Sequence, residues 1–247
     1  MPFTISHAAA VLPLHRLSNH KLPLSALMIG SMAPDFGYFF SHEASRQLTH
    51  SFAGLFIFAL PAGLLVWLFY VAILEKATIT LLSDRWHTRF AHTDALTLRL
   101  VGLASIAIIL GAITHLVWDE FTHRETFITL TFPALSAPTP GFRWLPIYHL
   151  LQGLSSVAGL VFLWMWAQGL HRVPAKSLIR PYKMTERARI GALWFIGIAT
   201  VLAGLLDWLP YARSRYDLQI FYLAVGSMSG LFIAWSCVAI ALWIKAR

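Results

Sequence analysis

Between Leu100 and His123 the chain reads LVGLASIAIILGAITHLVWDEFTH. The stretch from Leu100 to Trp118 contains no Asp, Glu, Lys or Arg, and its length is close to the roughly 20 residues that an α-helix needs to cross a bilayer. His115 and Asp119 stand at its end, four residues apart, so both side chains fall on one face of the helix. Ionisable groups at the end of a span are costly unless they face a polar cavity, a partner or a metal ion. The pair is therefore a candidate functional site.

The composition is that of a membrane protein. Hydrophobic residues make up 57% of the chain and charged residues 12%, roughly half the charged fraction of soluble domains. The predicted spans are Phe52–Leu74, Leu100–Trp118, Ile147–Leu170, Leu218–Ile244 and the slightly short Ile190–Leu206. We therefore expect an all-α fold, a polytopic membrane bundle of about five transmembrane helices. We expect it to be a single domain over residues 1–247, with an N-terminal segment over 1–51 and the bundle over 52–244.

Two stretches outside these spans are harder to assign. Leu22–Phe40 is mostly apolar but contains Pro34 and Asp35. Because Asp35 is costly in lipid, we expect a short or re-entrant helix that ends near Pro34. If this segment crossed the whole membrane, the N-terminus would lie on the opposite membrane face and His7 would not belong to the cluster described below. Thr131–Pro146 is rich in proline and aromatic residues, which is typical of a loop or an interfacial lid.

The net charge of +8 is explained better by membrane orientation than by nucleic-acid binding. The loop His171–Arg189 carries six basic residues against one acid, Glu186, which predicts a cytoplasmic location. If the spans alternate, the basic loop Lys76–Arg99 is cytoplasmic as well. We therefore expect a multi-pass protein of the inner membrane. On this orientation one set of ionisable residues faces outside the cytoplasm: His7, Asp35, His50, His115 and Asp119.

Those residues have the chemistry of metal ligands. Zinc and similar divalent ions favour imidazole nitrogen and carboxylate oxygen, and catalytic zinc sites keep one position open for water. Asp35, His50, His115 and Asp119 all fall at predicted span ends on one side, which predicts a metal site with His7 as a fifth candidate. The structural alternative is a His–Asp hydrogen bond that caps the span, and a lone histidine such as His7 is more often structural than a ligand. Candidates for contact with a substrate or with the ligands are His123, Arg124, Gln152 and Asp207.

The chain resembles an uncharacterised bacterial membrane-protein family, domain of unknown function 4184. The resemblance rests on MPFTISH at the N-terminus, MAPDFGYFF around Asp35, THLVWDEFTH around His115, and the block YHLLQGLSS that contains Gln152. More distantly, the chain is similar to the membrane-bound metal-dependent hydrolase family, which has an early His, a PD step, an HR-x2-THS block and a later H-x3-D. That similarity implies the same five ligands. The block RQLTHS departs from the pattern because no histidine precedes Arg46.

These observations lead to one expected function and two alternatives. We expect a membrane-embedded metal-dependent hydrolase that acts on a lipid or lipid-linked phosphoester and uses a divalent metal, with zinc as the expected ion. The sequence assigns no catalytic residue beyond the metal ligands. One alternative is a non-enzymatic membrane scaffold or partner protein whose His–Asp pairs are structural. A transporter would favour charged residues in the middle of several spans, and the sequence places them at span ends instead.

Overall fold

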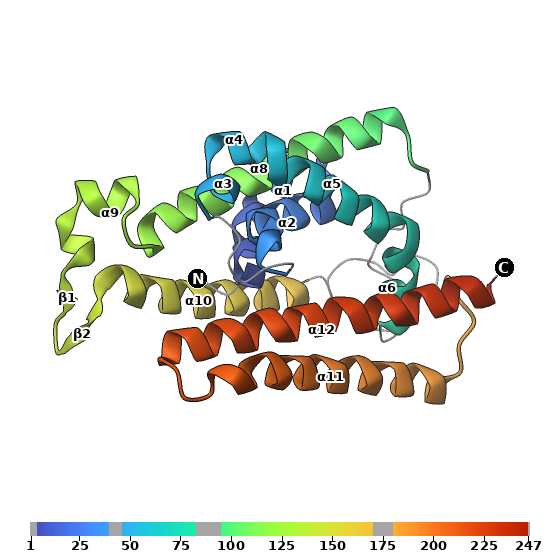
Figure 1. The fold of residues 1–247 in the computed structure, drawn as a ribbon. Helices are drawn as coiled ribbons and strands as arrows, with labels where there is room; N and C mark the ends of the chain where they lie inside the picture. The colour runs from blue at the N-terminus through green and yellow to red at the C-terminus, as the bar shows by residue number, and fades with distance from the viewer. Residues whose placement is uncertain (1–3, 40–45, 83–94, 170–179, 247) are drawn as a thin grey trace. The chain divides into compact units, whose positions relative to one another are not determined.

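The computed structural model describes residues 4–39, 46–82, 95–169 and 180–246, and these are almost entirely helical (Figure 1). The elements in chain order are η1 (Thr4–Val11), α1 (Leu12–Leu17), α2 (Leu24–Met32), η2 (Ala33–Phe39), α3 (Arg46–Thr49), α4 (Phe52–Gly54), η3 (Leu55–Ala59), α5 (Leu60–Phe69), η4 (Tyr70–Leu74), α6 (Glu75–Leu81), α8 (Leu98–Thr122), α9 (Phe127–Thr131), η5 (Pro133–Ser136), β1 (Pro138–Thr139), β2 (Phe142–Pro146), α10 (Ile147–Gly169), α11 (Glu186–Trp208), η7 (Leu209–Tyr211) and α12 (Tyr216–Lys245).

Five helices within the described ranges are long and apolar enough to cross a membrane. They cover Phe52–Leu81, Leu98–Thr131, Ile147–Gly169, Glu186–Tyr211 and Tyr216–Lys245. The prediction of an all-α multi-pass bundle with short N-terminal helices is therefore confirmed. The helices are longer than the apolar runs because polar residues at their ends continue the helical backbone, as Asp119 does in α8.

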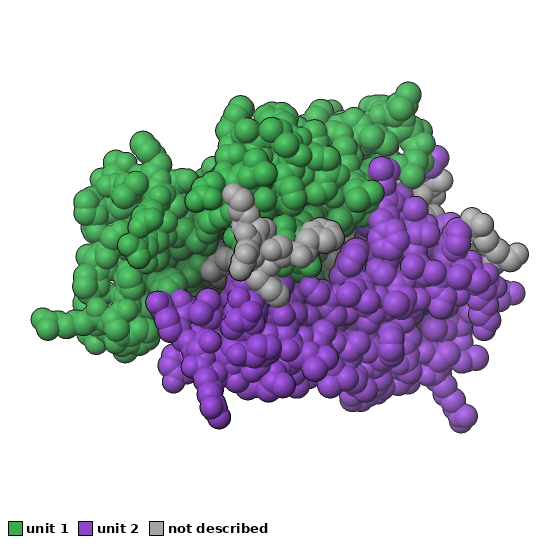
Figure 2. Space-filling model, in the orientation of Figure 1, with its two compact units in different colours: residues 1–67, 96–167 green, residues 68–95, 168–247 purple. Residues whose placement is uncertain are grey.

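The chain forms two compact units (Figure 2). The first consists of residues 1–67 and 96–167, and the second of residues 68–95 and 168–247. The expected single domain with a boundary at residue 51 stays a prediction. All five predicted metal ligands belong to the first unit.

The first unit is organised around the contact between α2 and α8 (Figure 1). Glycines on both helices allow their backbones to touch: a Cβ atom on Gly30 would lie 2.3 Å from the Ile108 carbonyl oxygen, and one on Gly111 would lie 2.3 Å from the Leu27 carbonyl oxygen. At nine residues α2 is roughly 14 Å long, about half the thickness of a bilayer core. The predicted short helix is thus present, and the tighter 3-10 turns of η2 follow it and carry Asp35.

The stretch predicted as a loop or lid, Thr131–Pro146, contains a small hairpin. β1 pairs antiparallel with β2, and Thr139 is the partner of Phe142. Gly141 makes the turn with a φ of 83°, a conformation that favours glycine. The sequence pattern did not indicate this hairpin because proline-rich segments have few of the alternating residues that mark strands.

In the second unit, α11 and α12 lie side by side (Figure 1). Gly226 and Gly230 of α12 meet α11 closely: a Cβ atom on Gly230 would lie 2.4 Å from the Ala203 Cβ. The G-x-x-x-G spacing therefore packs two helices of the same chain. At the end of α6, Arg189 donates to the Leu81 carbonyl oxygen at 3.1 Å and satisfies one of the carbonyls that a helix end leaves free.

Candidate metal centre

The predicted ligands come from four separate segments of the first unit. His7 lies on η1, Asp35 on η2, and His50 directly after α3, while His115 and Asp119 lie one turn apart on α8. His50 is placed by the start of the first long helix, where the Ser51 hydroxyl accepts the Gly54 N–H at 2.9 Å. The fold therefore brings together residues that are as many as 112 positions apart in the sequence.

Four donor atoms form a tight cluster. His50 Nε2 lies 3.3 Å from Asp35 Oδ1, 3.5 Å from Asp119 Oδ2 and 3.3 Å from His115 Nε2. His115 Nε2 in turn lies 3.6 Å from Asp35 Oδ1 and 3.5 Å from Asp119 Oδ2. Two ligands that share one zinc ion at tetrahedral angles, each about 2.0–2.1 Å from it, are about 3.4 Å apart. The five measured pairs among these donors therefore have the spacing of ligands that share a cation.

A backbone carbonyl fixes the orientation of His115. The ring is completely buried, and its Nδ1 lies 2.8 Å from the carbonyl oxygen of Ser31. A carbonyl oxygen can only accept, so Nδ1 carries the proton and the lone pair of the neutral ring lies on Nε2. Metal-ligating histidines usually make this second contact, because it sets both the tautomer and the ring orientation.

The cluster leaves polar atoms without partners. His7 Nε2, Asp35 Oδ1 and Asp119 Oδ1 are buried, and none has a hydrogen-bond partner within the described residues. Buried polar atoms without partners are uncommon, because each costs free energy comparable to a lost hydrogen bond. Lone pairs of neighbouring nitrogen and carboxylate oxygen atoms also repel one another unless a proton or a cation lies between them. The donor set and its unpaired atoms fit a divalent cation.

Asp35 is held as a carboxylate. Its Oδ2 accepts a hydrogen bond from the Thr4 hydroxyl at 2.7 Å, which leaves Oδ1 directed at His50 and His115. Burial by itself raises the pKa of Asp35, but His115 in its protonated form and the His50 ring, whose Nε2 lies 3.3 Å from Oδ1, outweigh it and keep the pKa below its usual range. Asp35 is therefore ionised at neutral pH, the state in which a carboxylate binds metal.

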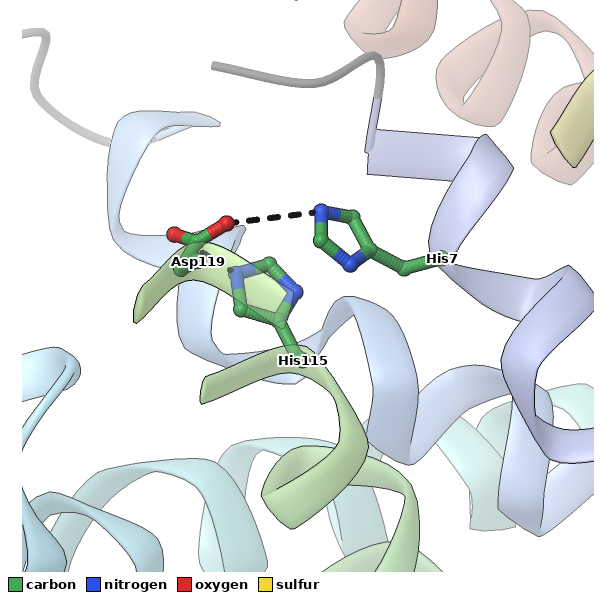
Figure 3. A group of neighbouring side chains, drawn as sticks. All are labelled: His7, His115 and Asp119. Carbon is green, nitrogen blue, oxygen red and sulfur yellow. Dashed lines mark ion pairs between the residues drawn. The ribbon is translucent and has the colours of Figure 1, made fainter. Parts of the chain in front are cut away.

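His7 stacks on His115 beside this cluster (Figure 3). The two ring centroids are 3.9 Å apart, and His7 Nε2 lies 3.7 Å from Asp119 Oδ1. Burial and, to a smaller extent, the nearby His115 lower the pKa of His7 to about 3, so the imidazole is neutral at pH 7. His7 faces Oδ1 of Asp119, whereas His50 and His115 face Oδ2. His7 therefore lies at the edge of the four-donor cluster.

The residues predicted to contact a substrate or the ligands divide into two groups. Gln152 Nε2 donates to His123 Nε2 at 3.3 Å, so the proton of the neutral His123 ring is on Nδ1. This Nδ1 lies 3.3 Å from the backbone carbonyl oxygen of Asp119 and 3.4 Å from Oδ1 of the same residue. His123 and Gln152 thus support Asp119. Arg124 pairs with Glu125 at 3.0 Å and its side chain is 76% exposed, while Asp207 belongs to the second unit.

The structure adds contacts that the sequence analysis did not assign. Arg46 donates from Nη2 to Asp119 Oδ2 at 2.9 Å, and Thr49 Oγ1 lies 2.9 Å from His50 Nδ1. Arg46 and His50 are four residues apart, a spacing that signals neighbours in a helix and would have pointed to Arg46. The contact of the Ser31 carbonyl could not be predicted from the sequence, because every residue type carries a backbone carbonyl.

Comparisons with known proteins place the chain in a family. A comparison with curated proteins and one with solved structures found no match. The family described as a domain of unknown function (DUF4184) matches residues 1–242, which confirms the first of the two resemblances. The more distant similarity to membrane-bound metal-dependent hydrolases stays a prediction. Because the match covers nearly the whole sequence, the chain belongs to this family of unknown function.

Proposed function

We propose that this protein is an integral-membrane, metal-dependent hydrolase. The observation that carries the proposal is the convergence of Asp35, His50, His115 and Asp119, whose donor atoms are 3.3–3.6 Å apart in each measured pair. Two imidazole nitrogens and two carboxylate oxygens are the ligand types of zinc and related ions. Among the described residues, two overlapping groups that share His115 have ligand atoms within 4.8 Å of one another: His7–His115–Asp119 and Asp35–His50–His115.

The proposed reaction is the hydrolysis of an ester. A divalent ion in such a site supplies a water molecule whose pKa is about 7 and polarises the bond to be broken. The protein's own residues hold the ligands in place: Ser31 orients His115, Thr4 orients Asp35, and His123 with Gln152 supports Asp119. His7, which is neutral, faces Asp119 Oδ1 from the edge of the cluster.

The surroundings of the site favour a lipid or lipid-linked phosphoester as substrate. Asp119 is buried in α8, but its neighbours Val117, Trp118 and Phe121 are 55%, 43% and 46% exposed. Large apolar side chains exposed on a membrane-spanning helix are suited to contact with acyl chains. We further propose that the site opens on the outer face of the bacterial inner membrane, because the basic loops predict that the opposite face is cytoplasmic.

Metal-dependent turnover of lipid phosphoesters tests this function. Purified full-length protein in mixed micelles would be assayed for release of phosphate or headgroup from a panel of phospholipids and lipid phosphates. We expect chelation to abolish release, zinc or manganese to restore it, and Asp119→Asn to remain inactive with either metal. The matched control is Asp217→Asn, which changes an exposed aspartate of the second unit. Bound metal without turnover on any substrate would favour a non-enzymatic membrane protein instead.

A further inference from the structure

Arg46 connects the exposed surface of the first unit to the buried cluster. Its side chain is 34% exposed, whereas the side chain of its partner Asp119 is 5% exposed. Arg46 begins the short helix α3, one turn before His50, so its guanidinium reaches the same group of donors as the His50 ring. Arg46 is thus a partly exposed residue that contacts a candidate ligand directly.

The contact that Arg46 makes conflicts with a bound cation. Asp119 Oδ2, which accepts the Arg46 hydrogen bond at 2.9 Å, is also the oxygen that lies 3.5 Å from both His50 Nε2 and His115 Nε2. With neutral imidazoles, Asp35, Asp119 and Arg46 sum to one negative charge. A divalent ion changes that sum to one positive charge and places the guanidinium beside a like charge. Coulomb repulsion at such a short distance is strong inside a protein.

We infer that Arg46 is the substrate-binding residue of this site, and that it exchanges Asp119 for the anionic oxygens of a phosphoester when the cation is bound. This inference rests on the proposed function and adds how the site selects its substrate. A guanidinium presents a planar fork of donors that matches phosphate oxygens, and it keeps its charge at any physiological pH. With one net positive charge and a displaced, partly exposed arginine, the loaded site favours an anionic ester over a neutral one.

Arg124, another arginine of the first unit, provides the comparison. It belongs to the same unit, but its guanidinium pairs with Glu125 at 3.0 Å and is 76% exposed. A phosphate near the ligands would therefore meet Arg46 before Arg124. Replacing Arg124 removes the same charge from the protein without touching Asp119, and this makes it the matched control.

Phosphate binding to the manganese-loaded protein tests the inference. Full-length wild type, Arg46→Gln, Arg46→Lys and Arg124→Gln would be purified in a phosphate-free non-ionic detergent, loaded with Mn²⁺ and first assayed for metal content. Inorganic phosphate and dihexanoyl phosphatidic acid would then be titrated by calorimetry. Mn²⁺-induced relaxation of the ³¹P signal would report whether the phosphate lies next to the ion. Tighter binding of the lipid would identify a lipid headgroup as the source, and equal binding a free phosphate.

We expect Arg46→Gln to keep its manganese and to lose phosphate affinity by about tenfold or more, the effect of losing a charge-assisted hydrogen bond. Arg46→Lys should recover part of the affinity, and Arg124→Gln should match wild type. Equal phosphate affinity in wild type and Arg46→Gln would overturn the inference, and so would loss of manganese from Arg46→Gln, since Arg46 would then only position Asp119. Wild type that binds no manganese would instead refute the proposed function, and the metal assay separates this outcome from the others.

Discussion

His115 shows how a buried side chain is prepared for a ligand. The Ser31 carbonyl accepts a hydrogen bond from Nδ1–H of His115, and Nε2 lies within 3.6 Å of side-chain atoms from η2, from the residue after α3 and from its own helix. A histidine that only capped the span would need one acceptor. The ring of His115 has several on the side of Nε2, and this excess favours a cation over a simple hydrogen bond.

Replacement of the ligands should therefore remove the metal. We expect His115→Gln and Asp119→Asn to lower the zinc content of the purified protein from about one ion to a small fraction of that value, because each removes a donor of the four-atom cluster. The matched control is His149→Gln on α10 of the same unit, which should keep its zinc. Inductively coupled plasma mass spectrometry measures all four proteins, and equal zinc content in each would reject the assigned ligands.

His7 should make the stability of the metal-free protein depend on pH. Its pKa is about 3 in the folded protein and 6.5 as a free side chain, so the unfolded chain binds more protons between these values. The contribution of His7 to the free energy of unfolding is therefore fully present above about pH 6.5, and it is lost as the pH drops toward 3. We expect the thermal midpoint of chelator-treated wild type to decrease more between pH 7 and pH 4.5 than that of His7→Gln. Parallel pH curves for the two proteins would show that His7 is not buried in its neutral form.

Residue patterns pointed to the candidate ligands but not to the groups that contact them. His7, Asp35, His50, His115 and Asp119 could be predicted because ionisable residues are rare and costly beside apolar spans. Three of them have buried atoms with no hydrogen-bond partner among the described residues, as a binding site would have. The contacts of Arg46 and of the Ser31 carbonyl depend on the three-dimensional arrangement of α3, α2 and α8, which spacing alone does not give.

At the scale of elements, the site depends on how closely α2 approaches α8. The Ser31 carbonyl reaches His115 only because Gly30 and Gly111 let the two backbones touch. A Cβ atom at Gly111 would lie 2.6 Å from the Ser31 nitrogen, so any side chain there must push α2 away. The helix contact and the histidine orientation are therefore one structural feature.

Gly111→Ala should separate these helices. We expect it to destabilise the protein by roughly 1–3 kcal/mol, as overpacking does, and to weaken zinc binding because Ser31 moves away from His115. Gly102→Ala on the same helix is the matched control: a Cβ atom there would meet no described atom within 4 Å, so this change should be neutral or slightly stabilising. Thermal unfolding and zinc titration measure both effects, and a Gly111→Ala protein that behaves like Gly102→Ala would contradict the close contact.

The elements were predictable to different extents. The five long helices followed from hydropathy, because a span must satisfy its backbone internally and be apolar over its length. Their ends did not follow, because α8 continues through Asp119 to Thr122 where the chain turns polar. The β1–β2 hairpin was missed because its strands are short and contain proline.

At the scale of the whole molecule, the charge distribution predicts the orientation. Arg124→Cys and Lys245→Cys, each made in a Cys237→Ser background, would place one thiol near the proposed outer end of α8 and one near the proposed inner end of α12. We expect a membrane-impermeant maleimide to label position 124 in intact cells and position 245 only after lysis. Labelling in the opposite pattern would put the candidate site on the cytoplasmic face.

The proposed chemistry depends on whether one ion is shared by side chains that are distant in the sequence. X-ray absorption spectroscopy at the zinc edge of the purified, zinc-loaded protein tests this directly. We expect nitrogen and oxygen ligands at about 2.0–2.1 Å with the outer-shell scattering of two imidazole rings. A zinc ion surrounded by oxygen alone, or a protein that retains no zinc after dialysis, would contradict the metal site.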